Sequence, residues 1–148
     1  VIVNVSSIAG RVAPPYGGAY SASKHALEAM SESLHFEVSQ LGIRVHLIEP
    51  GRFATGFQDN IVHPASWTGS AQEQRALAFR NSLTSLDGGG PPSDPQAVAD
   101  AIARAATDPS MPFRTLVGED AALIDATKTS MSFEDFETTM RTALDWHD

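Results

Sequence analysis

The sequence predicts an α/β fold, specifically the C-terminal half of a doubly wound parallel sheet. Two β-branched runs, Val1–Val5 and Ile43–Ile48, indicate buried parallel strands. Between them, residues from about Gly18 to Leu41 follow helical spacing and complete a strand–helix–strand unit. A third strand is expected at Arg114–Val117. Three strands make a thin sheet for this much helix, so we expect the first half of the domain to precede this chain.

Composition limits the function. The 148 residues, 42% of them hydrophobic, suffice for one globular domain with a core. A net charge of −8 argues against nucleic acid and anionic membranes as partners. The lack of Cys fits a reducing compartment, so we expect a cytoplasmic protein. We expect no membrane span, since no apolar run approaches ~20 residues, and no metal site, since the histidines lack H-x-x-x-H spacing.

The central helix carries two titratable side chains one turn apart, Tyr20 and Lys24, which open an otherwise apolar stripe expected to face the interior. The other members of this stripe are Leu27, Leu34, Val38 and Leu41. Three glutamates are expected outside it, namely Glu28, Glu32 and Glu37. An ammonium about 4 Å from a phenol oxygen favours the phenolate by roughly 4 kcal/mol at an effective dielectric of about 20, which suits a general acid/base. The alternative is a core tyrosine beside a lysine that reaches solvent.

Candidate ligand-binding residues follow the first two strands. Ser6-Ser7 ends the first strand and Pro50-Gly51 ends the second. Proline cannot donate to a strand ladder, and glycine lets the backbone approach a ligand. Because ligands of open α/β sheets bind beyond the carboxyl ends of the strands, we expect both pairs at one site.

Three motifs in order resemble the short-chain dehydrogenase/reductase family, whose fold is Rossmann-like. They are N-V-S-S-I-A-G, Y-S-A-S-K and G-I-R-V-H-L-I-E-P-G-R-F-A-T. Ser7 stands 13 residues before Tyr20, as the catalytic serine of that family stands before its tyrosine. The clear similarity covers Val1 to about Thr55. A weaker similarity over residues 94–121, with P-F-R-T-L-V-G-E-D-A, looks like a hydroxysteroid- or retinol-dehydrogenase-like branch.

The resemblance implies an oxidoreductase that transfers a hydride between NAD or NADP and a secondary alcohol or carbonyl substrate. Tyr20 would be the general acid/base, and Lys24 would assist it and bind the nicotinamide ribose. Ser7 would hold the substrate oxygen where charge develops, beside Tyr20. Four further residues match the segment that packs around the nicotinamide: Pro50, Gly51, Phe53 and Thr55. As alternatives, Ser7 could be a turn residue, Pro50-Gly51 a strand stop and Thr55 a helix cap.

The glycine-rich cofactor half of the family domain is absent from this chain. Gly88-Gly89-Gly90 cannot replace the phosphate loop, because Pro91-Pro92 follows it instead of a helix start. We therefore expect residues 1–148 alone not to bind a nicotinamide dinucleotide tightly by calorimetry. Two alternatives stay open: a non-catalytic binding or assembly fragment, and a family epimerase or dehydratase using the same Tyr–Lys pair. The resemblance also implies a homo-oligomer when full length, with the central helix near an interface.

We divide the chain into a catalytic core (1–55), a substrate lid region (56–93) and a C-terminal scaffold (94–148). A helix is expected over Ala71–Leu83 in the lid, and glycines and prolines provide breaks. The apolar residues of the lid suggest a lipophilic alcohol or ketone, although they could merely pack the lid onto the body. These residues are Phe57, Ile61, Val62, Trp67, Leu77, Phe79, Leu83 and Leu86. In the scaffold, Asp94-Pro95 and Ser132 should start helices. We expect Trp146 either to pack against a neighbouring subunit or to lie on the surface.

Overall fold

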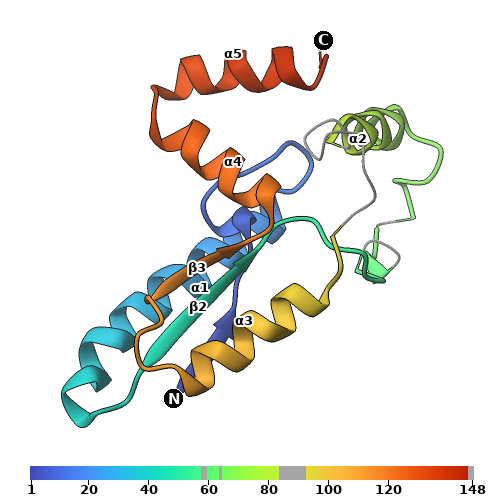
Figure 1. The fold of residues 1–148 in the computed structure, drawn as a ribbon. Helices are drawn as coiled ribbons and strands as arrows, with labels where there is room; N and C mark the ends of the chain where they lie inside the picture. The colour runs from blue at the N-terminus through green and yellow to red at the C-terminus, as the bar shows by residue number, and fades with distance from the viewer. Residues whose placement is uncertain (58–59, 64, 84–92, 147–148) are drawn as a thin grey trace.

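The computed structural model describes residues 1–57, 60–63, 65–83 and 93–146 (Figure 1). Within these residues a parallel sheet has the strand order β1-β2-β3. Its strands are β1 (Ile2–Val5), β2 (Val45–Pro50) and β3 (Arg114–Val117). The register pairs Val5 with Ile48 and Pro50 with Val117. The predicted α/β class and the three predicted strands are confirmed.

Five α-helices connect and cover the strands of the described chain. They are α1 (Gly18–Val38), α2 (Ala71–Ser82), α3 (Gln96–Thr107), α4 (Glu119–Thr129) and α5 (Phe133–Ala143). After α1, the short 3₁₀ turn η2 (Ser39–Leu41) ends at Gly42, which has a φ of 73°. Such a positive φ favours glycine, and the helical segment ends near Leu41, as the spacing predicts.

Side chains at the helix starts satisfy backbone N–H groups, as the sequence predicts. Asp94 Oδ1 accepts from the Gln96 N–H at 2.9 Å, and Ser132 Oγ accepts from the Asp135 N–H at 3.2 Å. At the start of α2, Ser70 Oγ accepts from the Glu73 N–H at 3.1 Å. Each such cap contributes about 1 kcal/mol to its helix.

The two faces of the sheet differ in character, and α1 and α3 cover opposite faces (Figure 1). The α3 face is apolar, and its core is Ile48, Ala105 and Met111, with Val98, Ile102 and Val117 packed around it. The α1 face is mixed: since successive strand residues point to opposite sides, Glu49 of β2 shares this face with the buried Leu47. Asn4 on β1 donates to Ser31 of α1 at 2.8 Å, and the side chain of Glu49 on β2 is fully buried. The site residues described below lie near the carboxyl ends of the strands.

The side of α1 that is buried differs from the apolar stripe predicted to face the interior. The buried residues of this helix are Ser21, Glu28 and Ser31, whereas Tyr20 is 36% exposed and Leu41 is 70% exposed. Small hydroxyl side chains let the helix lie close to the sheet, and an arginine on β3 neutralises the buried glutamate. An amphipathic pattern cannot reveal this arrangement, since it counts serine and glutamate as solvent-facing.

Two further expectations need correction. The first strand is not fully buried: β1 pairs with β2 at one edge of the described sheet, and Val5 is 42% exposed. Helix α4 was not foreseen from the sequence. It begins after Gly118, whose φ of 108° suits glycine, and it lacks the Ser/Thr cap that marks α2 and α5.

Helices α2, α4 and α5 gather beyond the carboxyl ends of the strands (Figure 1). The α2 ring of Phe79 lies 6.3 Å from the Tyr16 ring and 5.3 Å from the Trp146 ring, measured between centroids. Trp146 therefore packs against α2 of its own chain and is half-buried, and a contact with a neighbouring subunit stays a prediction. The Arg141 guanidinium also lies 4.6 Å from the Trp146 ring centroid. Of the expected lid residues, Leu86 and the Gly88–Pro92 stretch lie outside the described residues.

Phe79 is the anchor of α2. We expect Phe79→Ala to raise hydrogen exchange across α2 by about tenfold or more, because removing a buried phenylalanine ring costs about 3 kcal/mol. Phe79 is 6% exposed, and it is the one buried residue of that helix. Leu77, 44% exposed on the same helix, is the matched control: Leu77→Ala should leave exchange nearly unchanged. Equal exchange in the two variants would contradict the anchoring role.

Candidate functional site

Ser7 lies just beyond β1 and connects the first two strand ends. Its hydroxyl accepts from the Ala9 N–H at 3.1 Å and donates to the Pro50 carbonyl at 3.4 Å. The residue is 9% exposed and caps the short 3₁₀ turn η1 (Ile8–Gly10). The predicted meeting of the Ser6-Ser7 and Pro50-Gly51 strand ends is therefore present. These contacts also show that the turn role expected as an alternative for Ser7 is real.

Lys24 and Tyr20 lie together at the start of α1. The Lys24 ammonium donates to the Val5 carbonyl at the end of β1, over 3.0 Å, and lies 5.6 Å from the centroid of the Tyr20 ring. Partial burial lowers the pKa of Lys24, and the nearby Glu28 carboxylate opposes that shift. The hydroxyl contacts of Ser7 run to Pro50 and Ala9, so the alignment of Ser7 with the Tyr20 phenol remains a prediction.

The segment after β2 is held by its backbone. The Gly51 N–H donates to the Val117 carbonyl at 2.8 Å, and Phe53 forms an isolated bridge with Ser93. Thr55 is exposed, and its hydroxyl oxygen accepts from the Phe57 N–H at 3.4 Å. The four predicted residues of this segment thus form one continuous loop at the carboxyl edge, beside Ser7.

Asp120, which the sequence analysis did not single out, secures this loop. Its side chain is 5% exposed, and its Oδ2 accepts from the Arg52 N–H at 2.7 Å. A Cβ added to Gly51 would lie 2.1 Å from Asp120 Oδ1, so glycine is required for this approach. A carboxylate at the first turn of α4 is also favoured by the helix dipole. The available signal was the G-E-D run after the last strand.

An aromatic side chain lies against Tyr20. The Tyr20 ring is 5.2 Å from the ring of Phe57, and both residues are exposed. In the expected lid region, His63 separately stacks on Trp67 with centroids 5.2 Å apart and planes 8° apart. An apolar substrate placed at Tyr20 would therefore meet an aromatic surface.

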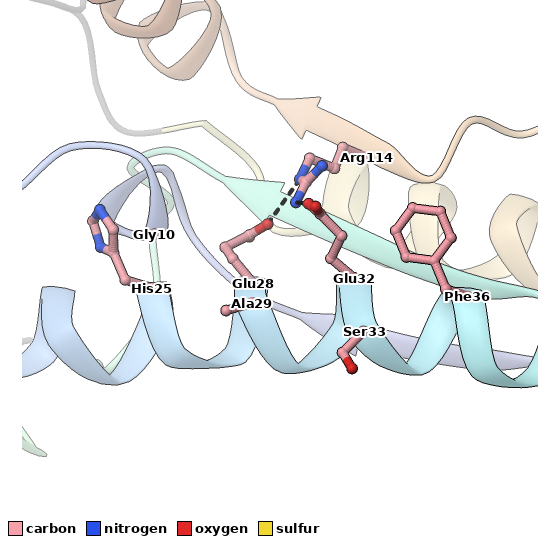
Figure 2. Close-up of a pocket in the computed structure, with 8 residues that line it drawn as sticks. All are labelled: Gly10, His25, Glu28, Ala29, Glu32, Ser33, Phe36 and Arg114. Atoms are coloured by element: carbon pink, nitrogen blue, oxygen red, sulfur yellow. Dashed lines mark hydrogen bonds and ion pairs between the residues drawn. The ribbon is translucent and has the colours of Figure 1, made fainter.

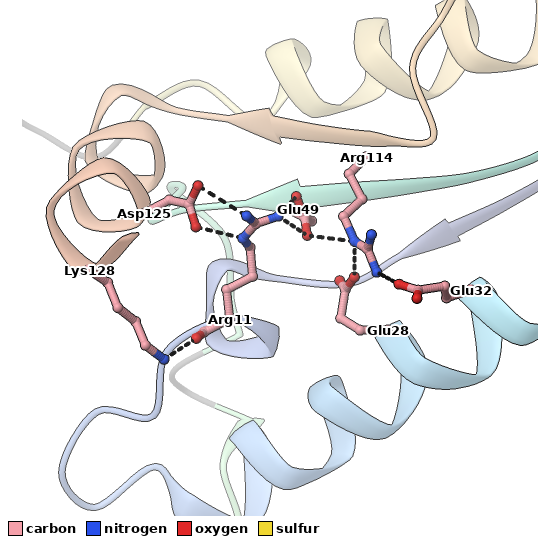
Figure 3. Close-up of polar contacts among 7 residues, drawn as sticks. All are labelled: Arg11, Glu28, Glu32, Glu49, Arg114, Asp125 and Lys128. Carbon is pink, nitrogen blue, oxygen red and sulfur yellow. Dashed lines mark hydrogen bonds and ion pairs between the residues drawn. The ribbon is translucent and has the colours of Figure 1, made fainter. Parts of the chain in front are cut away.

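A buried ion-pair group lies behind these residues, on the α1 face of the sheet (Figure 3). We call it the arginine–carboxylate cluster, and it comprises Arg11, Glu28, Glu32, Glu49, Arg114 and Asp125. Arg11 pairs with Asp125 at 2.6 Å and with Glu49 at 3.3 Å, and Arg114 pairs with Glu28 at 3.0 Å. Arg114 also reaches Glu32 at 2.5 Å and Glu49 at 3.9 Å. The sequence signal for it was a carboxylate, Glu49, directly after the predicted strand Ile43–Ile48.

Burial and the neighbouring Glu28 carboxylate raise the pKa of Glu49 to about 7, although Arg11 works in the opposite direction. The Glu49 side chain has no exposed surface, so desolvation of its charged form is the first cause. Among the described residues, the Oε1 atom of Glu28 is buried without a hydrogen-bond donor. A proton on Glu49 would supply that donor.

This raised pKa gives a pH dependence of stability. In the complete protein we expect the Glu49 contribution to the unfolding free energy to fall as pH rises from about 4.5 to about 7. The reason is that the folded form holds the Glu49 proton up to a higher pH than the unfolded form does. Urea unfolding at pH values below, within and above this window measures the slope. Glu49→Gln should remove that part of the slope, and an unchanged slope would contradict the assignment.

An open pocket of about 420 Å³ adjoins this cluster, between α1 and β3 (Figure 2). Glu28 and Glu32 point from α1 toward Arg114 across it, and His25 and Phe36 border it on either side of them along the helix (Figure 2). None of the predicted site residues lines this pocket. We therefore place the candidate site at the strand ends, on the residues above, and not in this pocket.

The described residues contain neither a metal-binding group of side chains nor a membrane-spanning helix. No group of three or more His, Cys, Asp or Glu side chains there is arranged to hold a metal ion. No helix among them has both the length and the apolar character needed to cross a membrane.

Comparison with known proteins identifies the motifs. Residues 1–65 match the family model described as short chain dehydrogenase. Over 121 residues the chain is 41% identical to the 3-ketodihydrosphingosine reductase of Bacteroides thetaiotaomicron, covering 79% of this chain and 43% of that relative. Over 58 residues it is 52% identical to the rat 17-beta-hydroxysteroid dehydrogenase type 6, covering 39% of this chain and 18% of that protein. The chain thus spans less than half the length of these relatives.

Solved structures show the same fold. A short chain dehydrogenase from Burkholderia cenocepacia, solved in complex with NADP, superposes with a TM-score of 0.64 at 22% identity. The match covers 97% of this chain and 46% of that one. A short-chain dehydrogenase from Streptomyces avermitilis gives a TM-score of 0.63 at 26% identity, covering 99% and 52%.

Proposed function

Because this chain belongs to the short-chain dehydrogenase family through its first 65 residues, we propose that it supplies the proton-transfer half of a nicotinamide-dependent oxidoreductase. The complete protein would interconvert a secondary alcohol and a carbonyl compound, with NAD or NADP as the hydride carrier. The observation that carries this proposal is the position of Lys24, which is bonded to the end of β1 and placed beside the Tyr20 ring.

The residues present fit the nicotinamide end of such a cofactor. The Lys24 ammonium is a donor for ribose hydroxyl groups, and the exposed Thr55 hydroxyl can donate to a carboxamide. The Phe57 ring, 5.2 Å from the Tyr20 ring, offers apolar surface there. When bound, the cofactor supplies or accepts the hydride at the reacting carbon.

Tyr20 is the proposed general acid/base. In reduction its hydroxyl proton passes to the carbonyl oxygen of the substrate, and in oxidation the phenolate takes the proton of the alcohol. The positive charge of Lys24 stabilises the phenolate that results. The Ser7 hydroxyl, freed from its long bond to the Pro50 carbonyl, donates to the substrate oxygen as negative charge develops there.

We propose a lipophilic substrate. The support is the aromatic surface of Tyr20 and Phe57 and the relatives named for a ketosphingosine and a hydroxysteroid. We also propose the division into catalytic core (1–55), lid (56–93) and scaffold (94–148), a homo-oligomeric complete protein, and a cytoplasmic location. Asp120 shows how the scaffold segment would serve the site, since it holds the loop after β2.

The complete open reading frame that contains these residues tests the proposal. The purified protein is mixed with NADH or NADPH and a panel of lipophilic ketones, and the absorbance of the reduced nicotinamide is followed. We expect consumption with one of the two cofactors, at a rate that saturates with ketone. A protein that binds cofactor but turns over no ketone or alcohol would favour a non-catalytic fragment or a cofactor-retaining epimerase or dehydratase.

A further inference from the structure

Glu49 occupies an unusual position for a carboxylate. It is the penultimate residue of β2, directly before Pro50, and has no exposed surface. Its side chain points to the α1 face, where the arginine–carboxylate cluster surrounds it (Figure 3). A buried charge of this kind is costly unless its partners compensate it, so its retention needs a reason.

Three residues around Glu49 belong to, or adjoin, elements that carry a residue of the proposed site. Arg11, 3.3 Å away, directly follows η1, which Ser7 caps. Glu28, whose Oε1 is buried without a hydrogen-bond partner, lies one helical turn after Lys24 on α1. Pro50 is the next residue of β2. Glu49 therefore lies where three parts of the proposed site come together. They are the turn η1 capped by Ser7, helix α1 with Tyr20 and Lys24, and the loop that begins at Pro50.

The outer members of the cluster hold this junction in place. Asp125 on α4 binds Arg11 through two contacts, at 2.6 and 3.1 Å. Arg114 on β3 bonds Glu28 at 3.0 Å and lies 3.9 Å from Glu49. Lys128 on α4 donates to the Arg11 carbonyl (Figure 3). Arg11 and Arg114 keep their positive charge at ordinary pH. The net charge of the arginine–carboxylate cluster therefore changes through its carboxyl groups.

We propose that Glu49 is a positioning residue, which aligns Ser7 and the Tyr20–Lys24 pair with the loop that begins at Pro50. The proposal rests on the proposed function for its effect on turnover, but the alignment itself is a property of the fold. A displacement of about 1 Å between reacting groups can cost on the order of a hundredfold in rate. The charged groups that face the junction are Arg11, Glu28, Glu32, Arg114, Asp125 and Lys128.

The test compares Glu49→Ala, Glu49→Gln and Glu32→Gln in the complete protein. Glu49→Ala should lower kcat by about thirtyfold or more, with the cofactor KM within about threefold of wild type. Glu49→Gln should restore most of kcat, because its amide can accept from Arg11 and donate to Glu28, and its pH profile should lack the step near pH 7. Glu32, with a side chain 51% exposed on the same Arg114, is the matched control and should leave kcat unchanged.

Amide hydrogen exchange tests the positioning role of Glu49 independently of the proposed oxidoreductase activity. Glu49→Ala should accelerate exchange at the amides of Gly10 and Gly51, which bond to Ser7 and Val117, more than at amides of α3. That result supports the positioning role even if no ketone is turned over. Uniform acceleration across the chain, or a Glu49→Ala kcat within a few-fold of wild type in an active protein, would overturn it.

Discussion

Tyr20→Phe is expected to lower turnover of the complete protein by at least about a hundredfold and to leave its fold intact. A positioned general acid/base contributes on the order of a hundred- to ten-thousandfold, and phenylalanine has no proton to exchange. The fold should tolerate the change, because Tyr20 is 36% exposed and its contact with Phe57 runs through the ring, which phenylalanine keeps. Steady-state kinetics and thermal melting measure the two halves of this prediction.

The chain offers a matched control for this substitution. Tyr16 is its other tyrosine, it is 48% exposed, and its ring likewise contacts a phenylalanine, Phe79. Tyr16→Phe should therefore leave both turnover and melting temperature near their wild-type values. If Tyr20→Phe retained activity within a few-fold of wild type, the assigned role of Tyr20 would be refuted.

Gly51→Ala should destabilise the complete protein by about 2–6 kcal/mol and remove its cofactor-dependent activity. The new methyl group would lie 2.1 Å from Asp120 Oδ1 and 2.5 Å from Asp120 Cγ, so the loop or the first turn of α4 has to move. Overpacking of this kind costs about 1–3 kcal/mol. Loss of the bond from the Arg52 N–H to a buried carboxylate adds about as much.

Gly18→Ala is the matched control, because a Cβ at Gly18 meets nothing within 4 Å. Urea unfolding should find that variant within about 0.5 kcal/mol of wild type. The double variant Gly51→Ala/Asp120→Ala should be less unstable than the sum of its single changes, since the clashing atoms are gone. Additive losses would show that the Gly51–Asp120 contact does not determine the loop.

Local signals predicted much of the fold. The β-branched runs located β1 and β2, and Asp94, Ser132 and Gly42 mark helix ends through contacts within a few residues. Such contacts depend on the chemistry of a short stretch, so the sequence is enough to find them. Helix α4 was not predicted, because it begins after a glycine with a positive φ and has no side-chain cap of this kind.

The site was predictable where motif and strand end coincide, and not where it depends on distant pairs. Ser7, Lys24 and Pro50 meet at the ends of β1 and β2, as expected for ligand sites in parallel sheets. The burial of Glu28 depends on Arg114, 86 residues later, and the loop at Arg52 depends on Asp120, 68 residues later. No periodicity within α1 could indicate that a glutamate would face the sheet.

The central claim is that this chain provides the proton for a hydride transfer from a nicotinamide, and an isotope label tests it most directly. The complete protein is incubated with a reduced nicotinamide cofactor deuterated at its transferable position and with a lipophilic ketone. Mass spectrometry then locates the label. The account predicts one deuterium on the carbinol carbon of the alcohol product in wild type, and at least about a hundredfold less labelled product in Tyr20→Phe over the same time. Retention of the label in the cofactor while substrate is converted would contradict it.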